Sequence, residues 1–220
     1  KNNITYTMLN YTYGTNGIKV PTGKDYLVNV WPCTGNNPST DTKYQEYKNK
    51  VKEDINRVRD KVDLLIVAMH WGIEYTHIPT SYQIDMANYL SSLGVDIIIG
   101  THPHVVMPIT YINDTLVIYS LGNFLSAQET NIDYNTTVGL LSTVTITKYI
   151  DKDNNTSIKL SNQNNELIYT YSKNNKDYKV IPFSNPNIKT YLNDYERVYN
   201  KYVSIITNMD NNIKVKSIAS

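Results

Sequence analysis

Three of the four histidines follow apolar segments that are typical of buried β-strands. The segment at residues 63–69 runs directly into His70, and the segment at 95–99 is followed closely by His102 and His104. In an open α/β sheet, side chains that follow the carboxyl ends of neighbouring parallel strands lie around one crevice. We therefore expect the three imidazoles to form one cluster.

A cluster of this kind predicts a metal site, because neutral imidazole is a common protein ligand for transition metals. A tight turn after Gly100 can direct His102 and His104 to neighbouring points, whereas an extended backbone would place them on opposite faces. Pro103 stiffens this loop. A rigid loop that holds two histidines is suitable for a dinuclear centre, whose ions lie about 3.5 to 4 Å apart. A lone His-x-His pair is more often a solvated or hydrogen-bonded loop feature, so the metal interpretation depends on all three histidines. The fourth, His77, is interpreted as a surface or supporting residue.

Length and composition restrict the class of protein. A chain of 220 residues can form one large hydrophobic core, and no apolar run approaches the roughly 20 residues of a transmembrane helix. The formal net charge is +1 with interspersed signs, which argues against nucleic acid as a partner. The single cysteine, Cys33, excludes an internal disulfide and is interpreted as an unpaired thiol.

The first half of the chain alternates predicted strands and helices. The predicted elements are strands at 4–9 and 26–30, a helix from Thr40 or Asp41 to Lys61, a strand at 63–69, a helix at 81–93 and a strand at 95–99. A polar cap begins the first helix and Gly94 ends the second. Alternation of this kind is typical of a parallel α/β sheet, so the strands at 63–69 and 95–99 should be adjacent and parallel.

The second half is predicted to be mainly β. The predicted elements are strands at 106–112 and 115–120 joined by a turn at Asn113 and Asp114, strands at 138–149, 166–172 and 178–183, polar turns at 151–156 and 163–165, and a helix at 188–208. No internal repeat or long linker is present. We therefore expect one α/β domain over residues 1–220.

Four segments resemble those of a known family, in the same order. They are Tyr-Thr-Tyr-Gly-Thr-Asn-Gly at 11–17, His-Trp-Gly-Ile-Glu-Tyr at 70–75, Leu-Gly-Val-Asp-Ile-Ile-Ile-Gly-Thr-His-Pro-His-Val at 93–105 and Ile-Tyr-Ser-Leu-Gly-Asn-Phe at 118–124. With them the chain resembles the poly-γ-glutamate capsule biosynthesis family called CapA or PgsA. The resemblance implies a metallophosphoesterase-like layered α/β fold with mixed sheets and a C-terminal helix. Residues 1–130 contain the motifs, whereas 131–220 match only in general layout.

The resemblance also implies a set of metal ligands. His70 and His102 would share one divalent ion and His104 would bind a second, with Mn, Zn and Fe all open as the metal. Family members supply the bridging carboxylate and other ligands from an earlier segment with a Gly-Asp pair, an Asn-Leu-Glu-like stretch and an Asn-Asn-His motif. We expect this segment upstream of Lys1, either as a separate chain held in the same fold or as a part this sequence lacks. The domain would then be N-terminally incomplete.

Further residues are candidates for catalysis. Glu74 lies four residues after His70 and could act as acid, base or substrate-orienting carboxylate. His70 is the second candidate catalytic residue. The alternative for Glu74 is a solvated loop glutamate. Trp71 is expected to pack beneath the site.

Four polar residues in turns are candidates for substrate binding. Ser120 and Asn123 follow a predicted strand, where Gly122 permits close backbone approach. They would contact substrate or support the histidine loop, and a purely structural turn is the alternative. Thr15 and Asn16 have the same two interpretations.

Two functions remain open. The first is a metal-dependent hydrolase of phosphoesterase type, acting on an anionic polymer or a phosphoester at the extracytoplasmic cell surface. The second is a non-catalytic surface subunit of a polymer synthase or export complex, which binds polymer or membrane-bound synthase subunits. An amidohydrolase barrel is disfavoured, because too little chain follows His104 to form the remaining βα units.

Overall fold

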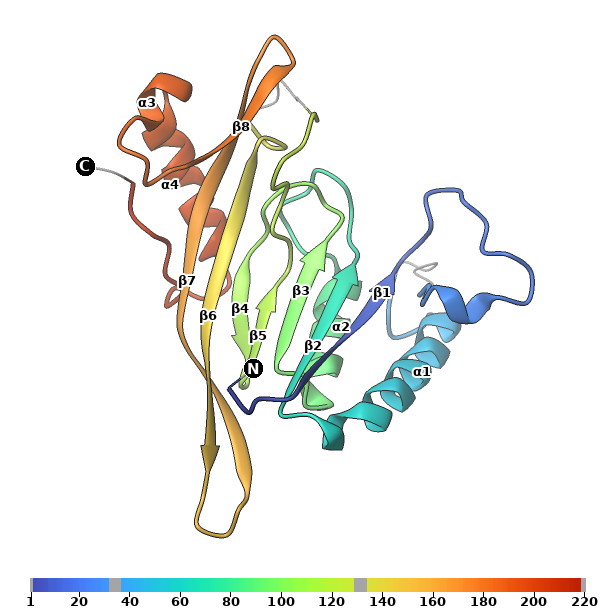
Figure 1. The fold of residues 1–220 in the computed structure, drawn as a ribbon. Coiled ribbons are helices and arrows are strands. Elements are labelled where there is room, and N and C mark those ends of the chain that lie inside the picture. The colour runs from blue at the N-terminus through green and yellow to red at the C-terminus, as the bar shows by residue number, and fades with distance from the viewer. Residues whose placement is uncertain (1, 32–36, 129–133, 219–220) are drawn as a thin grey trace.

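The computed structural model describes residues 2–31, 37–128 and 134–218, so Cys33 lies outside the described residues. Figure 1 shows the elements in chain order. They are β1 (Tyr6–Thr12), α1 (Thr42–Val58), β2 (Leu64–His70), α2 (Ser81–Ser92), β3 (Ile97–Thr101), β4 (Ile109–Ile112), β5 (Thr115–Ile118), β6 (Val138–Ile150), β7 (Thr156–Lys173), β8 (Lys176–Pro182), α3 (Ile188–Tyr191) and α4 (Tyr195–Ile206), with short 3-10 turns at Asp25–Leu27 and Arg59–Lys61.

The strands form two sheets. The first has the order β1-β2-β3-β5-β4, in which β4 runs antiparallel to four parallel strands. The second is an antiparallel sheet with the order β6-β7-β8. Helices α1 and α2 lie on one side of the first sheet, and the second sheet lies on the other with α4 behind it (Figure 1). The predicted layered α/β fold with mixed sheets is confirmed.

The period of two along β2 explains the layers, because successive side chains of a strand point to opposite faces. Leu65, Val67 and Met69 pack with α1 and α2 in one core. Leu64 and Ile66 pack in a second core, which also contains residues of the second sheet and of α4. Burial on both faces accounts for the nearly continuous apolar run of the strand.

The ends of the two long helices follow from local sequence. The Asp41 side chain accepts a hydrogen bond from the backbone N–H of Tyr44 at the start of α1. Thr80 and Gln83 form a capping box at the start of α2, and Gly94 adopts a positive φ just after its end. The predicted helices therefore form close to their expected positions.

One predicted element near the N-terminus is wrong, and the predicted C-terminal helix forms as two helices. Residues 26–30 do not form a strand: Tyr26 and Leu27 are 71% and 59% exposed, and only Val30 forms an isolated bridge, with Thr12. The segment lacks a buried face that would stabilise a strand. The predicted helix at 188–208 is divided into α3 and α4, because Leu192 is extended between them.

The predicted turn at 163–165 is also wrong, because these residues lie inside β7. Asn165 is fully buried there, and its side chain donates to the carbonyl of Lys214. This partner is 49 residues away in sequence, so a local pattern of polar residues could not indicate it. Strand β4 begins at Ile109, later than predicted, and its turn to β5 at Asn113 and Asp114 is confirmed.

Asp63 joins three elements at the start of β2. Its carboxylate accepts hydrogen bonds from the backbone and hydroxyl of Thr5, at 2.8 and 2.9 Å, and pairs with Lys148 of β6 at 2.8 Å. The hydrogen bond from Lys148, together with those from Thr5, lowers the pKa of Asp63 to about 2. The charged carboxylate therefore links β1, β2 and the second sheet.

Replacing Asp63 with Asn should lower the free energy of unfolding near neutral pH, because Lys148 loses its charged partner. The folded-state pKa of Asp63 is depressed, so its contribution is complete above the unfolded value of about 3.9 and is lost as pH falls toward about 2. Urea denaturation at a series of pH values should show the difference between wild type and Asp63→Asn shrinking over this range. Asp60→Asn, at an exposed neighbouring carboxylate, is the control; an equal effect of both variants would contradict the prediction.

Candidate functional site

The parallel register brings three polar side chains into one row at the end of the first sheet. Thr12 at the end of β1 is paired with His70 of β2, which is paired with Thr101 of β3. The predicted adjacency of β2 and β3 is confirmed. His102 and His104 follow Thr101 directly, so the sheet delivers all three histidines to the same edge.

The imidazole rings lie close together. The ring centroids of His70 and His102 are 4.6 Å apart, and those of His102 and His104 are 6.2 Å apart. His77 has other partners: its ring bonds to the carbonyl of Val106 and packs edge-on against Tyr202. The expected cluster of three histidines is confirmed, and His77 lies outside it.

The loop after β3 holds its histidines in an unusual backbone conformation. His102 has φ of 94° and His104 has φ of 59°, whereas residues with a Cβ atom seldom adopt positive φ. Strain of this kind costs of order 1 to 3 kcal/mol per residue and is concentrated at functional sites. The tight turn predicted here therefore exists, and it is maintained by the surrounding structure.

Trp71 and Gly100 provide part of that support. The fully buried Trp71 indole donates a hydrogen bond to the carbonyl of Tyr119 at 2.9 Å and stacks on its ring. Gly100 lies against the same carbonyl, and a Cβ atom there would come within 1.9 Å of the Tyr119 oxygen. Trp71 packs beneath the site as predicted.

Burial favours the neutral form of two of the imidazoles. Desolvation lowers the pKa of His70 and of His102 below the ordinary histidine value, and the neighbouring histidines lower both further. Glu74 opposes this shift at both positions. A neutral imidazole retains the lone pair that a metal or a proton requires.

Two hydrogen bonds orient the outer histidines. The Thr12 hydroxyl lies 2.9 Å from Nδ1 of His70, and the Asn123 side-chain oxygen lies 3.0 Å from Nδ1 of His104. Asn123 therefore contacts the histidine loop, and its contact with substrate stays a prediction. Thr12 was not among the predicted site residues, although it lies in the motif at 11–17.

Two tyrosines that the sequence analysis did not single out flank the cluster. The Tyr13 ring stacks on His70 at 5.4 Å and lies 4.4 Å from the His102 ring. The Tyr75 ring stacks on that of His104 at 6.1 Å. Both tyrosines lie in the motifs at 11–17 and 70–75, which was the only signal for them in the sequence.

Glu74 lies near the mouth of the cluster. One of its carboxylate oxygens is 3.9 Å from Nε2 of His104, and the side chain is 49% exposed. The next residue, Tyr75, donates its backbone N–H to the carbonyl of Pro103, which fastens the loop of Glu74 to the histidine loop. The geometry is compatible with a proton-transfer role, and that role stays a prediction.

The remaining predicted substrate residues have structural partners. Ser120 is 1% exposed, and its hydroxyl accepts the backbone N–H of Gly122. Thr15 donates to the carbonyl of Ile18 within its own turn, and Asn16 is exposed at a positive φ. Contacts of these residues with substrate stay predictions.

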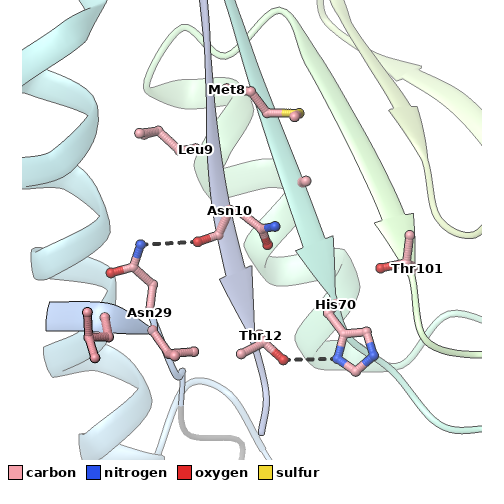
Figure 2. A pocket seen from close by; sticks show the side chains of 10 residues that line it. Met8, Leu9, Asn10, Thr12, Asn29, His70 and Thr101 are labelled. Carbon is pink, nitrogen blue, oxygen red and sulfur yellow. Dashed lines mark hydrogen bonds between the residues drawn. The ribbon is translucent and has the colours of Figure 1, made fainter. Parts of the chain in front are cut away.

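A shallow trough of about 660 Å³ leads along the sheet to His70. Figure 2 shows Met8, Asn10 and Thr12 in succession along β1, with Thr12 beside His70 and Thr101 of β3 at the same end of the sheet. Part of the trough wall comes from residues 27–29. The trough therefore connects the edge of β1 with the histidine cluster.

Comparison with known proteins is decisive for the family. Residues 1–128 match the model of the bacterial capsule synthesis protein family PGA_cap. The chain belongs to this family. All the clustered histidines, Glu74 and Asn123 lie within the matched residues.

Two relatives agree with this family assignment. The chain is 43% identical over 74 residues to the PGA biosynthesis protein CapA of Bacillus subtilis (strain 168), and 36% identical over 80 residues to the capsule biosynthesis protein CapA of Bacillus anthracis. Each match covers 34% of this chain and 20% of the relative, so the chain spans only about a fifth of these relatives. One similar solved structure is that of GAP50, the anchor in the inner membrane complex of Plasmodium. The match covers 83% of this chain and 55% of the GAP50 chain at 14% sequence identity, and its TM-score of 0.31 supports no further argument.

The chemistry of the donors fits a divalent transition metal, but the set is incomplete. Imidazole nitrogens and a nearby carboxylate are suitable ligands. Within residues 2–31, 37–128 and 134–218, however, no group of three His, Cys, Asp or Glu side chains is placed to hold a metal ion. The described residues therefore do not by themselves form a complete metal site.

Gly100→Ala should destabilise the protein by about 1 to 3 kcal/mol or more, because the new methyl group would displace the Tyr119 carbonyl and break its hydrogen bond with Trp71. The variant Gly14→Ala is the matched control near the same site, since no atom lies within 4 Å of the added methyl group. Its effect should stay within about 0.5 kcal/mol. Urea denaturation measures both, and equal stability of the two variants would contradict the proposed support.

Proposed function

We propose that this chain is part of a capsule polymer biosynthesis protein with a metal-dependent, phosphoesterase-like hydrolytic site. The main supporting observation is the convergence of His70, His102 and His104 at one sheet edge. The positive φ angles of the two loop histidines support a functional reason for the arrangement. Family membership supports the link to capsule synthesis.

In this proposal the complete site binds two divalent ions, of Mn, Zn or Fe. His70 and His102 would hold one ion together, and His104 would hold the other. Such ions supply Lewis-acid activation of a phosphoryl or carbonyl group. The bridging carboxylate would come from outside the described residues, in keeping with the incomplete donor set.

The chain's own residues would orient and protonate the substrate. Glu74, exposed beside His104, would transfer a proton at the reacting group, with His70 as the second catalytic side chain. Asn123, Ser120, Asn16 and Thr15 would position substrate or the loops around it.

The proposed substrate is an anionic polymer such as poly-γ-glutamate, or a phosphoester formed during its synthesis. The named relatives are a PGA biosynthesis protein and a capsule biosynthesis protein. We therefore propose a location at the cell envelope, on the extracytoplasmic surface, with membrane-bound synthase subunits as partners. Among the described helices, none is long and apolar enough to cross a membrane.

The second candidate function is a non-catalytic surface subunit that binds polymer or synthase partners. The observation that favours it is the lack of a full metal-binding group among the described residues. In that case the histidine cluster would be part of the structure without binding metal. Metal binding and turnover distinguish the two candidates.

The chain alone should bind Mn²⁺ or Zn²⁺ weakly, and His102→Ala and His104→Ala should each weaken this binding further. Isothermal titration calorimetry and plasma emission spectroscopy measure affinity and stoichiometry. Adding the N-terminal segment of the Bacillus subtilis relative should raise both, because more ligands fix the geometry of the site. Turnover of phosphoester and γ-glutamyl substrates should then appear, and Glu74→Gln should lower it without loss of metal.

His77→Ala is the matched control, because His77 lies outside the cluster. It should leave metal affinity unchanged. Equal losses in His77→Ala and His102→Ala would contradict the proposed ligands. Full stoichiometry without the added segment would contradict a shared site and indicate a self-contained centre.

We further propose that a strand-forming segment with an apolar face covers β1 in the complete protein. Tyr6 and Met8 of β1 are 65% and 58% exposed, although they are paired with Leu64 and Ile66, which pack in the core on the same face. β1 is the last strand of its sheet among the described residues. An uncovered apolar edge strand is a ready site for strand addition.

Met8→Lys should leave the stability of the chain within about 0.5 kcal/mol, because the side chain is exposed. It should weaken binding of the added N-terminal segment about tenfold or more, since the charge would be buried in the new interface. Met209→Lys, an exposed methionine elsewhere, is the control. Fluorescence titration with the labelled segment measures both, and equal affinities would exclude β1 as the docking surface.

A further inference from the structure

We propose that Thr12 and Asn123 are positioning residues that fix His70 and His104 in the Nδ1–H tautomer, so that both imidazoles present an unprotonated Nε2 to the site. The effect of these tautomers on metal binding rests on the proposed function. The hydrogen bonds themselves are independent of any metal. Neither residue needs to touch the substrate.

The hydroxyl of Thr12 has one proton to donate. Its oxygen lies 2.7 Å from the carbonyl oxygen of Gly14, which can only accept, so the proton points there. The same hydroxyl lies 2.9 Å from Nδ1 of His70. Thr12 must therefore accept at this contact, and the proton lies on Nδ1 of His70. Nε2 of a neutral His70 then carries the lone pair.

Asn123 imposes the same state on His104 by a different route. Its amide nitrogen donates to the carbonyl of Thr136 at 3.0 Å and lies 3.3 Å from the side-chain oxygen of Gln128. The reversed amide orientation would place its oxygen against these acceptors, so the observed orientation is the satisfied one. The Asn123 oxygen then faces Nδ1 of His104 at 3.0 Å and accepts its proton.

The register of the sheet makes the first contact specific. Thr12 and His70 are paired residues of adjacent parallel strands, so their side chains share one face. Tyr13, directly after Thr12, stacks on the His70 ring at an interplanar angle of 13° and holds its plane. The tautomer and the ring orientation are therefore both fixed by the end of β1.

The consequence for ligand binding follows from the two ring nitrogens. A neutral imidazole binds a metal or accepts a proton only through the nitrogen that lacks hydrogen, and the partner of the other nitrogen decides which one that is. Free histidine favours the Nε2–H form, in which Nε2 cannot act as a ligand. Thr12 and Asn123 reverse this preference at two of the three clustered histidines.

The test is a long-range ¹⁵N–¹H correlation spectrum of the labelled 220-residue chain, without metal, at pH about 8, where imidazole is neutral. Wild type should show His70 and His104 as Nδ1–H. Thr12→Val should shift His70 toward Nε2–H and leave His104 unchanged, whereas Thr12→Ser should retain the wild-type pattern. Asn123→Leu, which removes the acceptor at Nδ1, should change His104 alone.

A wild-type His70 in the Nε2–H form, or identical His70 spectra of Thr12→Val and Thr12→Ser, would overturn the inference. Amide spectra of the variants establish that each is folded. Metal titration then tests the proposed metal site separately from the tautomer assignment. Thr12→Val should lower metal affinity about tenfold relative to Thr12→Ser. Correct tautomers with no metal binding in any protein would refute the proposed function and leave the tautomer assignment standing.

Discussion

The parallel register of β1, β2 and β3 is the constraint on which the site depends. It places Thr12, His70 and Thr101 in one row, and every further site residue follows one of these strands or β5. A shift of one residue between β1 and β2 would turn Thr12 to the opposite face from His70. The buried alternation of β2, which divides its side chains between two cores, opposes such a shift.

The strained histidine loop begins at a rigid junction between β3 and the segment that follows β5. Gly100 permits β3 to approach the Tyr119 carbonyl, and Trp71 from the neighbouring strand end bonds to that same carbonyl. The positive φ angles of His102 and His104 therefore arise just beyond a well-packed junction. The packing of Gly100 and Trp71 against Tyr119 offsets the strain of the loop, and this packing involves none of the imidazoles.

The sequence was sufficient to predict the histidine cluster and insufficient to predict its partners. Continuous apolar runs of strand length, each ending at histidine, are signals that depend on local sequence alone. The contact between Thr12 and His70 depends on the register of β1, and the predicted strand ended at residue 9, three residues before Thr12. Asn165 inside β7 is a similar case, since its partner Lys214 comes from the C-terminal segment. Long-range partners decide such positions, and one sequence does not reveal them.

One trough connects the exposed apolar face of β1 with the histidine cluster. Met8, Thr12 and His70 line this trough, and Met8 lies on the same face of β1 as Thr12, which is paired with His70 (Figure 2). A segment that covered this face of β1 from Met8 to Thr12 would reach His70. The second sheet covers the neighbouring strands but leaves Tyr6 and Met8 exposed. In our proposal, burial of this apolar surface provides the free energy that holds the added segment, and the same segment brings the missing ligands to the histidines. Completion of the sheet and completion of the metal site would then be one event.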